Sequence, residues 1–332
     1  MIPLASQVGG HPGVQTSEDG SIVFKLVFAR EMNFYQSLTS NPVSAALRPY
    51  IPKFYGVLGS EGQVEDGAYP PPKLEKDKYP HLKVHREITR MLTTTTRWIV
   101  LENLSHGFSK PNVIDIKLGT RFYDEEASEE KKERMIKAAK DSTSLETGLR
   151  LTGFQVSDTY WSVLNELFYS FCPFCQVYDE STGQAMKVPR SYGRELKVSE
   201  LPVAITRFFP IRSEQSTQGL PKEQLLPIVE AIRNQVATIR GVFAQLEIRV
   251  VGGSFLIIYE GDPECGSRGT APRDAEGEDE ENTKAGPPCL VKLIDFAHTK
   301  VVEGEGPDEG VLLGMDTMLM LLDNRVSQIK DS

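Results

Sequence analysis

Residues 111–119, with the sequence PNVIDIKLG, constrain the fold of this chain more than any other stretch. Their apolar side chains predict a strand, in which Asp115 and Lys117 stand two positions apart. Because side chains alternate along a strand, both charged groups point to one face. Phosphoryl transfer uses such a pair, a carboxylate for the attacking hydroxyl and a cation for the moving phosphate. The alternative is an exposed ion pair that contributes little to stability.

Composition limits the classes of function that remain. The chain has 332 residues and is 39% hydrophobic, enough for one large two-lobed domain or for two domains. Its net charge of −9 argues against a protein that binds nucleic acid directly by broad phosphate neutralisation. Six carboxylates lie within residues 274–281, so the remainder is closer to neutral. A locally basic pocket for an anionic substrate is compatible with that remainder.

Several features indicate where the protein works. No apolar run approaches the roughly 20 residues that a membrane span requires. The first ten residues contain no basic residue and no long apolar stretch, unlike a secretory signal. We therefore expect a nuclear and cytoplasmic protein.

Cys172 and Cys175 form a C-x-x-C pair, but a zinc site would need two more ligands, and Cys265 and Cys289 stand singly. Two packed thiols are the expected outcome.

The N-terminal third predicts strands around a lysine. Residues 22–28 alternate around Lys25 as a strand does, and apolar spacing predicts a helix over residues 30–35. Residues 59–80 are rich in glycine, proline and charge, and predict a mobile surface loop. Residues 97–101 predict the next strand, which ends at Glu102-Asn103-Leu104.

The remainder predicts a charged helix, two strands and a closing helix. Residues 127–140 are good helix formers, with Lys131, Lys132 and Arg134 on an edge largely clear of the acidic residues. Such an edge is usually a solvated face. Strands are expected over residues 254–260 and 290–296, with a disordered acidic loop at 261–288 between them and an apolar helix at 310–322.

Asp295 stands directly after two apolar residues at the end of the last predicted strand. A carboxylate on such a rigid support is well placed to bind Mg²⁺. An aspartate in this position would equally cap a turn. The residues alone leave both interpretations open.

Several motifs together resemble one family. Pro111, Asp115, Lys117 and Gly119 reproduce the pattern P-x-x-x-D-x-K-x-G of the inositol polyphosphate kinases. The chain is most similar to the fungal inositol polyphosphate multikinases, the type associated with arginine metabolism. The resemblance extends over most of the chain, through residues 120–124, 127–135, 148–153, 192–194 and 294–296.

The resemblance implies an α+β, two-lobed kinase-like fold. An antiparallel, ATP-binding N-lobe would occupy residues 1–103, and a larger C-lobe residues 104–332. The C-lobe would include a small insertion of inositol-phosphate-binding helices at about 121–150 and the acidic loop at about 261–288.

The same resemblance implies roles for individual residues, with ATP and Mg²⁺ as cofactors. Asp115 would orient or deprotonate the attacking hydroxyl, and Lys117 would neutralise charge on the transferring or substrate phosphate. Asp295 would bind the metal. The ATP-binding set would be Lys25, Glu102, Leu104, Asp115 and Asp295. The substrate-binding set would be Arg30, Lys117, Lys131, Arg134 and His298.

The implied activity is phosphorylation of inositol trisphosphate and tetrakisphosphate at the 3- and 6-hydroxyls to give the pentakisphosphate. Two alternatives remain, an inositol hexakisphosphate kinase, which shares the motif, and a transcription-complex scaffold that uses the kinase fold to hold transcription factors. A protein kinase is a poor fit, because the H-R-D-L-x-x-x-N and D-F-G sequences are missing. We expect a monomer.

Overall fold

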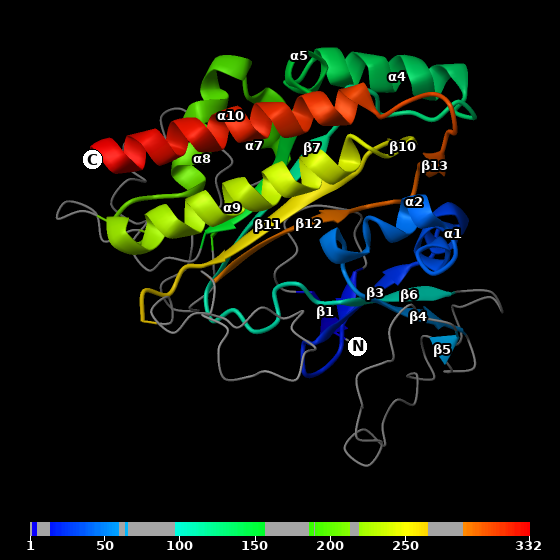
Figure 1. Ribbon diagram of the computed structural model, residues 1–332, viewed down its shortest axis with the longest axis horizontal. Coiled ribbons are helices and arrows are strands. Elements are labelled where there is room, and N and C mark those ends of the chain that lie inside the picture. The colour runs from blue at the N-terminus through cyan, green and yellow to red at the C-terminus, as the bar shows by residue number, and fades with distance from the viewer. Residues whose placement is uncertain are drawn as a thin grey trace.

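The computed structural model describes residues 2–4, 14–59, 64–65, 97–156, 186–188, 190–212, 219–264 and 288–332. Within these residues the chain has an α+β, kinase-like fold with two large antiparallel sheets, each at the centre of one lobe, and a separate two-stranded sheet (Figure 1). The C-x-x-C pair, most of the predicted loop at 59–80 and most of the acidic loop at 261–288 lie outside the described residues.

The N-lobe is a six-stranded sheet in the order β1-β2-β3-β6-β4-β5. Its strands are β1 (Ile2–Pro3), β2 (Gln15–Thr16), β3 (Ile22–Leu26), β4 (Phe54–Leu58), β5 (Val64–Glu65) and β6 (Trp98–Glu102). The helical segments are α1 (Ala29–Ser37), α2 (Pro42–Ala45) and the 3-10 turn η1 (Arg48–Tyr50). Strand β5 falls inside the stretch that the sequence predicted to be only loop, because Val64 and Glu65 pair with the end of β4.

Alternation in β3 and β6 gives the N-lobe sheet two apolar faces. Ile22 and Phe24 of β3 pack with Val100 of β6 in a small cluster on one face. Ile99 and Leu101 point to the other face and join the main core with residues of α1. Lys25 therefore points away from the small cluster, as the alternation predicted.

The C-lobe is built on a five-stranded sheet in the order β12-β11-β7-β8-β9. Its strands are β7 (Pro111–Leu118), β8 (Leu149–Val156), β9 (Met186–Val188), β11 (Ser254–Glu260) and β12 (Cys289–Ile294), and β10 (Ile248–Val250) pairs separately with β13 (Thr299–Val301). The helical segments are α4 (Glu129–Lys140), α5 (Ser144–Thr147), α7 (Arg190–Glu195), η3 (Val198–Glu200), α8 (Leu201–Phe208), α9 (Lys222–Phe243) and α10 (Glu309–Asp331).

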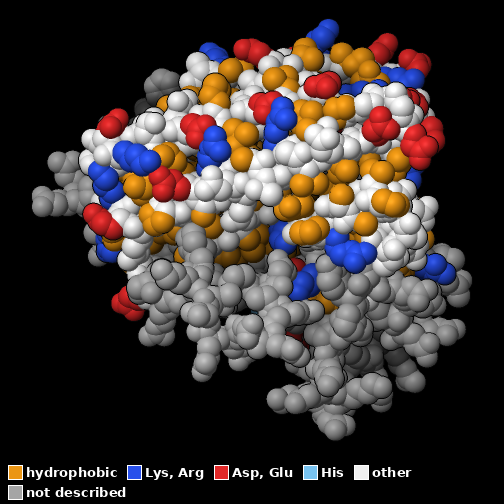
Figure 2. Space-filling view, viewed as in Figure 1, with side chains coloured by type: hydrophobic (Ala, Val, Ile, Leu, Met, Phe, Trp, Pro, Cys, Tyr) orange, Lys and Arg blue, Asp and Glu red, His pale blue; other side chains and the backbone are white. Residues whose placement is uncertain are grey.

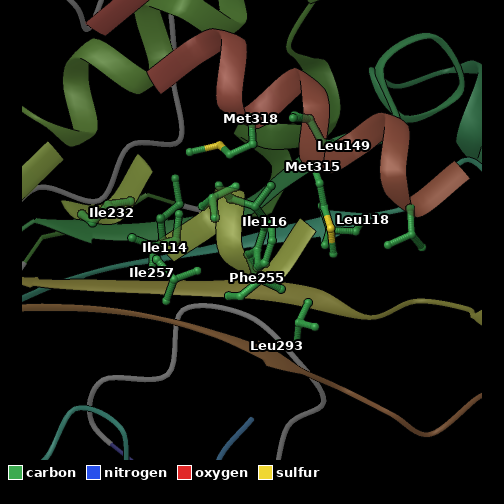
Figure 3. Close-up of a cluster of buried hydrophobic side chains, with 14 of the residues drawn as sticks. Ile114, Ile116, Leu118, Leu149, Ile232, Phe255, Ile257, Leu293, Met315 and Met318 are labelled. Atoms are coloured by element: carbon green, nitrogen blue, oxygen red, sulfur yellow. The ribbon is translucent and has the colours of Figure 1, made fainter. Parts of the chain in front are cut away.

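Helices α9 and α10 cover one face of the C-lobe sheet, and the N-lobe lies on its other side (Figure 1). Alternate β7 side chains meet the helices in the main core (Figure 3), which includes Ile114, Ile116, Leu118, Ile232, Met315 and Met318. Each such buried side chain contributes about 1.5–3 kcal/mol. Because these β7 residues face the helices, Asp115 and Lys117 between them face the N-lobe.

Ion pairs link the outer surfaces of α9 and α10, where charged and hydrophobic side chains are interspersed (Figure 2). Arg233 pairs with Asp323 and Arg240 with Asp316, both at 2.8 Å. Helix α10 is longer than the apolar stretch at 310–322 that predicted it, since its last turns are amphipathic. No helix among the described residues is both long enough and apolar enough to cross a membrane.

Candidate active site

Strand β7 buries the first predicted catalytic group. Asp115 is 2% exposed, and its Oδ1 has no hydrogen-bond partner among the described residues. Burial raises the pKa of this carboxyl, the charge of Lys117 lowers it, and Asp295 raises it again. Lys117 Nζ donates to the carbonyl oxygen of Gly252 at 2.9 Å. The pair is therefore not the exposed ion pair that the sequence left open.

An irregularity in the neighbouring strand β8 lies beside Asp115. Asp115 is opposite Gly153 and Ile116 is opposite Leu151, so Thr152 is an extra residue in β8. Its Oγ1 donates to the Asp115 carbonyl oxygen at 3.0 Å. Bulges of this kind often adjust the direction of side chains next to active sites. Here the bulge lies in β8, so the alternation of β7 is preserved.

Lys25 joins the two lobes through the buried carboxylate of Glu31 and the half-buried carboxylate of Asp295. Its Nζ donates to Glu31 Oε1 at 2.8 Å and to Asp295 Oδ1 at 2.7 Å. Burial lowers the pKa of Lys25, but the charges of Asp295 and Glu31 outweigh it and raise the pKa above its usual value. Lys25, Glu31 and Asp295 are called the inner cluster below.

Glu31 is a site residue that the sequence prediction missed. It lies in the first turn of α1 and is 1% exposed, and this burial raises its pKa. A strand lysine paired with a helix glutamate is the arrangement that holds the phosphate-binding lysine in protein kinases. The available signal was an acidic residue early in the helix that follows the lysine strand.

Asp295 has a backbone conformation that aspartate seldom adopts. Its φ is +67°, and it is the one non-glycine residue with positive φ in the described part of the chain. The next side chain, Phe296, is fully buried and stacks on Phe34 of α1, with ring centroids 4.2 Å apart. The packing of Phe296 holds the backbone in this strained form, and strain of this kind gathers at functional sites.

The surroundings of Asp295 fit a divalent metal shared with a phosphate ligand. Among the described residues no group of three His, Cys, Asp or Glu side chains could hold a metal by itself. Mg²⁺ is usually held by one or two carboxylates together with phosphate oxygens. The Asp295 carboxylate lies at a rigid strand end between Lys25 and the buried Asp115, so the donor set is of that kind.

A second group of charges lies further out. Asp124 Oδ2 lies 3.0 Å from Arg30 Nη1 and 2.9 Å from His298 Nδ1. Arg30 also pairs with Glu126. Burial alone would raise the pKa of Asp124, but the cations around it lower the pKa below its usual value. The sequence predicted that Arg30 and His298 would bind substrate, and here both bind the protein's own carboxylate.

Lys300 extends this group, since its Nζ lies 2.8 Å from Glu125 Oε2. We call the whole set the outer cluster. It consists of Arg30, Asp124, Glu125, Glu126, His298 and Lys300.

Helix α4 carries the remaining predicted substrate cations. Lys131 acts electrostatically on Asp124, so it faces the outer cluster. Arg134 is exposed and has no ion pair among the described residues. The predicted clear cationic edge was wrong for Lys132, whose Nζ lies 2.7 Å from Glu129 Oε1, because residues three apart are neighbours on a helix.

Arg150 of β8 is a second residue that the prediction missed. It lies directly opposite Lys117, and its Nε is buried without a hydrogen-bond partner among the described residues. Burial and the charge of Arg194 lower its pKa, while Asp115 raises it. Its guanidinium stacks over the Phe122 ring at 4.8 Å. Two arginines near each other with a buried, unpartnered donor form a favourable place for an anion.

The predicted adenine-binding residues lie where the two lobes join. The side chain of Glu102 accepts a hydrogen bond from the Lys53 amide at 3.3 Å. Asn103 Nδ2 donates a hydrogen bond to the Gly20 carbonyl oxygen at 2.6 Å. Leu104 is buried in an apolar cluster with Val113 of β7. This cluster lies beside the strand that leads to Asp295, so the placement is compatible with the predicted role.

Comparison with known proteins identifies the family. Residues 98–323 match the family model described as "Inositol polyphosphate kinase". The chain is 29% identical to the inositol polyphosphate multikinase of Saccharomyces cerevisiae, over 95% of this chain and 96% of that protein. It is 29% identical to inositol hexakisphosphate kinase 3 of Mus musculus, over 68% of this chain and 50% of that protein, so it spans about half the length of that relative.

Comparison of the fold with solved structures identifies the same family. The crystal structure of inositol phosphate multikinase Ipk2 from S. cerevisiae, in complex with ADP and Mn²⁺, matches with a TM-score of 0.67 and 26% identity, covering 92% of this chain and 100% of that one. The chain therefore belongs to the inositol polyphosphate kinase family, and it is an inositol phosphate kinase.

Proposed function

We propose that this enzyme is a multikinase that phosphorylates inositol trisphosphate and tetrakisphosphate at the 3- and 6-hydroxyls, giving inositol pentakisphosphate. The observation that carries the proposal is the meeting of Asp115, Lys117 and the Lys25–Asp295 pair on the inner side of the C-lobe sheet. The extent of the match supports the multikinase branch, since it covers nearly all of both this chain and the yeast multikinase.

The nucleotide would be ATP and the metal Mg²⁺. The ADP and Mn²⁺ in the yeast Ipk2 structure support a nucleotide and a divalent metal in general. Lys25 would hold the nucleotide phosphates, fixed in direction by Glu31. Asp295 would hold the metal, which when bound neutralises charge on the phosphates. The Glu102 carbonyl and the Leu104 amide would pair with adenine.

Asp115 would act on the attacking hydroxyl. Its unpartnered Oδ1 is available to accept the hydroxyl proton, and burial favours the protonated form of the carboxyl, so taking up a proton carries a low cost. Lys117, on the same face, would balance the charge that develops on the phosphate. This division of work requires only positioning and electrostatics, as phosphoryl transfer does.

Substrate phosphates would be held by the cations around this centre. Lys131 and Arg134 lie on α4. Arg150 lies opposite Lys117, and its Nε has no hydrogen-bond partner among the described residues. Arg30 and His298 would join this set when a substrate phosphate displaces their present partner, the Asp124 carboxylate. Charge-assisted contacts of this type are the strong way to bind a polyphosphate.

The test is incubation of the purified chain with Mg-ATP and, in separate reactions, inositol 1,4,5-trisphosphate and inositol hexakisphosphate, followed by anion-exchange separation. Stepwise tetrakis- and pentakisphosphate from the trisphosphate would support the proposal, and positional analysis of the products would test the 3- and 6-hydroxyls. Product from the hexakisphosphate alone would contradict it.

The second candidate is the hexakisphosphate kinase activity that the similarity to mouse hexakisphosphate kinase 3 favours. A role as a transcription-factor scaffold would coexist with either activity. An Asp115→Asn variant separates the two kinds of role, because a scaffold needs the fold and not the carboxylate. The nuclear and cytoplasmic location and the monomeric state are part of the proposal.

A further inference from the structure

The cations predicted to bind substrate in the outer cluster are occupied by the protein's own carboxylates. Arg30 pairs with Asp124 and Glu126, and His298 shares Asp124. Lys300 pairs with Glu125. Three consecutive carboxylates thus contact Arg30, His298 and Lys300, and the contacts with Asp124 and Glu125 are 2.8–3.0 Å long, close to the distance that a phosphate oxygen would take. The acidic segment is residues 124–126.

The acidic segment lies between β7 and α4, outside any helix or strand, and its backbone forms a turn in which the Ala127 amide donates to the Asp124 carbonyl oxygen at 3.2 Å. The side chains of Glu125 and Glu126 are 67% and 77% exposed. Such exposed ion pairs contribute little to stability, so a competing anion can separate them at low cost.

The acidic segment also removes the attraction that its cations would otherwise offer. Three carboxylates contact Arg30, Lys300 and His298, and they offset the positive charge that these side chains would otherwise offer. An incoming phosphate has to displace a carboxylate or remain beside it, and like charges side by side are unfavourable. Either route lowers affinity, and the loss grows with the number of substrate phosphates that reach this edge.

We propose that residues 124–126 form a carboxylate gate, which competes with substrate phosphates for Arg30, His298 and Lys300 and so disfavours the most highly phosphorylated inositol phosphates. The gate deepens the proposed function and rests on it, because it assigns to this segment the limit on how many phosphates the same site accepts. Glu125 and Glu126 are the specificity-determining members, since their pairs are the most exposed.

Calorimetric titration tests the gate without any catalysis. The probes are inositol hexakisphosphate and inositol 1,4,5-trisphosphate at one fixed ionic strength. The double variant Glu125→Gln/Glu126→Gln is compared with the wild-type chain. The matched control is Glu130→Gln/Glu133→Gln, which removes the same charge from exposed positions of α4 that have no ion pair among the described residues.

Removal of the gate should tighten hexakisphosphate binding by about five- to tenfold, the value expected for two exposed pairs, with a smaller gain for the trisphosphate. The control should change either affinity less than twofold. Unchanged or weaker hexakisphosphate binding by the gate variant would overturn the proposal. The carboxylates would then not compete with phosphate, and weaker binding would mean that they orient the cations for it. An equal gain in the control would also overturn the proposal, because it would indicate a general effect of net charge.

Turnover of the same variants distinguishes failure of the gate from failure of the proposed function. The inhibition constant of hexakisphosphate against trisphosphate turnover should fall in the gate variant and stay constant in the control. If the wild-type chain turns over neither compound, the proposed function fails. The binding comparison still decides whether the acidic segment competes with polyphosphates.

Discussion

The inner and outer clusters contain ion pairs of similar length in very different surroundings. In the inner cluster Lys25 contacts its two carboxylates at 2.7 and 2.8 Å, and the side chains of Lys25 and Glu31 are 13% and 1% exposed. In the outer cluster the Lys300–Glu125 pair is also 2.8 Å long, but its side chains are 47% and 67% exposed. Distance therefore does not distinguish the two clusters. Burial does for most of their side chains, although Asp295 and Asp124 are both 19% exposed.

The difference teaches what each cluster can do. A buried carboxylate that loses its cation is left uncompensated in a poorly solvated place, so the inner pairs act as a fixed support. Water can replace either partner of an exposed pair, so the outer pairs can open and close. The inner cluster suits a nucleotide and metal that need a rigid frame, whereas the outer cluster suits substrates that differ in phosphate number.

The largest expected effect comes from removal of the inner cation. Lys25→Met leaves Glu31 buried without its partner, which should lower the free energy of unfolding by about 3–5 kcal/mol. Arg30→Met in the outer cluster is the matched variant and should cost less than about 1 kcal/mol. Urea denaturation of both variants at pH 7 measures the difference. Equal losses would remove the distinction between the clusters.

The second test concerns the buried carboxylate on β7. Asp115→Asn should lower kcat with trisphosphate by about 10²- to 10⁴-fold, the usual contribution of a general base. Stability should stay within about 1 kcal/mol, because the change removes a buried charge whose Oδ1 has no hydrogen-bond partner among the described residues. Steady-state kinetics and urea denaturation are the measurements. Turnover that stays normal in the folded variant would refute the role of Asp115.

The third test separates backbone strain at Asp295 from its charge. Asp295→Gly and Asp295→Ala both remove the carboxylate, and both should abolish activity. The glycine variant should be more stable than the alanine variant by about 1 kcal/mol, because only glycine adopts a φ of +67° without cost. Differential scanning calorimetry of the pair measures this directly. Equal stability would show that the backbone relaxes when the carboxylate is gone.

Sequence reasoning predicted best what depends on local periodicity. Alternation placed Asp115 and Lys117 on one face of β7, and it turned Lys25 away from the small cluster formed by Ile22 and Phe24. Strand β11, strand β12 and helix α4 lie within a few residues of their predicted positions, the helix from its good helix formers and the strands with the help of the family resemblance. The family resemblance extended this to the two-lobed fold.

What it could not predict depends on packing between distant segments. Glu31 became part of the site because α1 packs so that its first turn meets Lys25, and Arg150 because β8 pairs with β7 in one register. The left-handed backbone of Asp295 depends on where Phe296 finds space beside Phe34. The pairing of Arg30 and His298 with one carboxylate joins three segments that are far apart in sequence.

The smallest expected effect is the pH dependence of the outer cluster. The cations around Asp124 hold its pKa below the usual 3.8, so its ion pairs stabilise the folded state above that pH and lose this contribution as pH falls through the lower value in the folded protein. Because the pairs are partly exposed, the whole effect should be below about 1 kcal/mol. Urea midpoints of the wild type and Asp124→Asn, measured from pH 6 to pH 3, should differ at pH 6 and converge toward pH 3. In 1 M NaCl the difference at pH 6 should also shrink, since salt screens exposed charges. A difference that persisted at pH 3 would mean that Asp124 stabilises the segment by packing, and the outer cluster would then resemble the inner one.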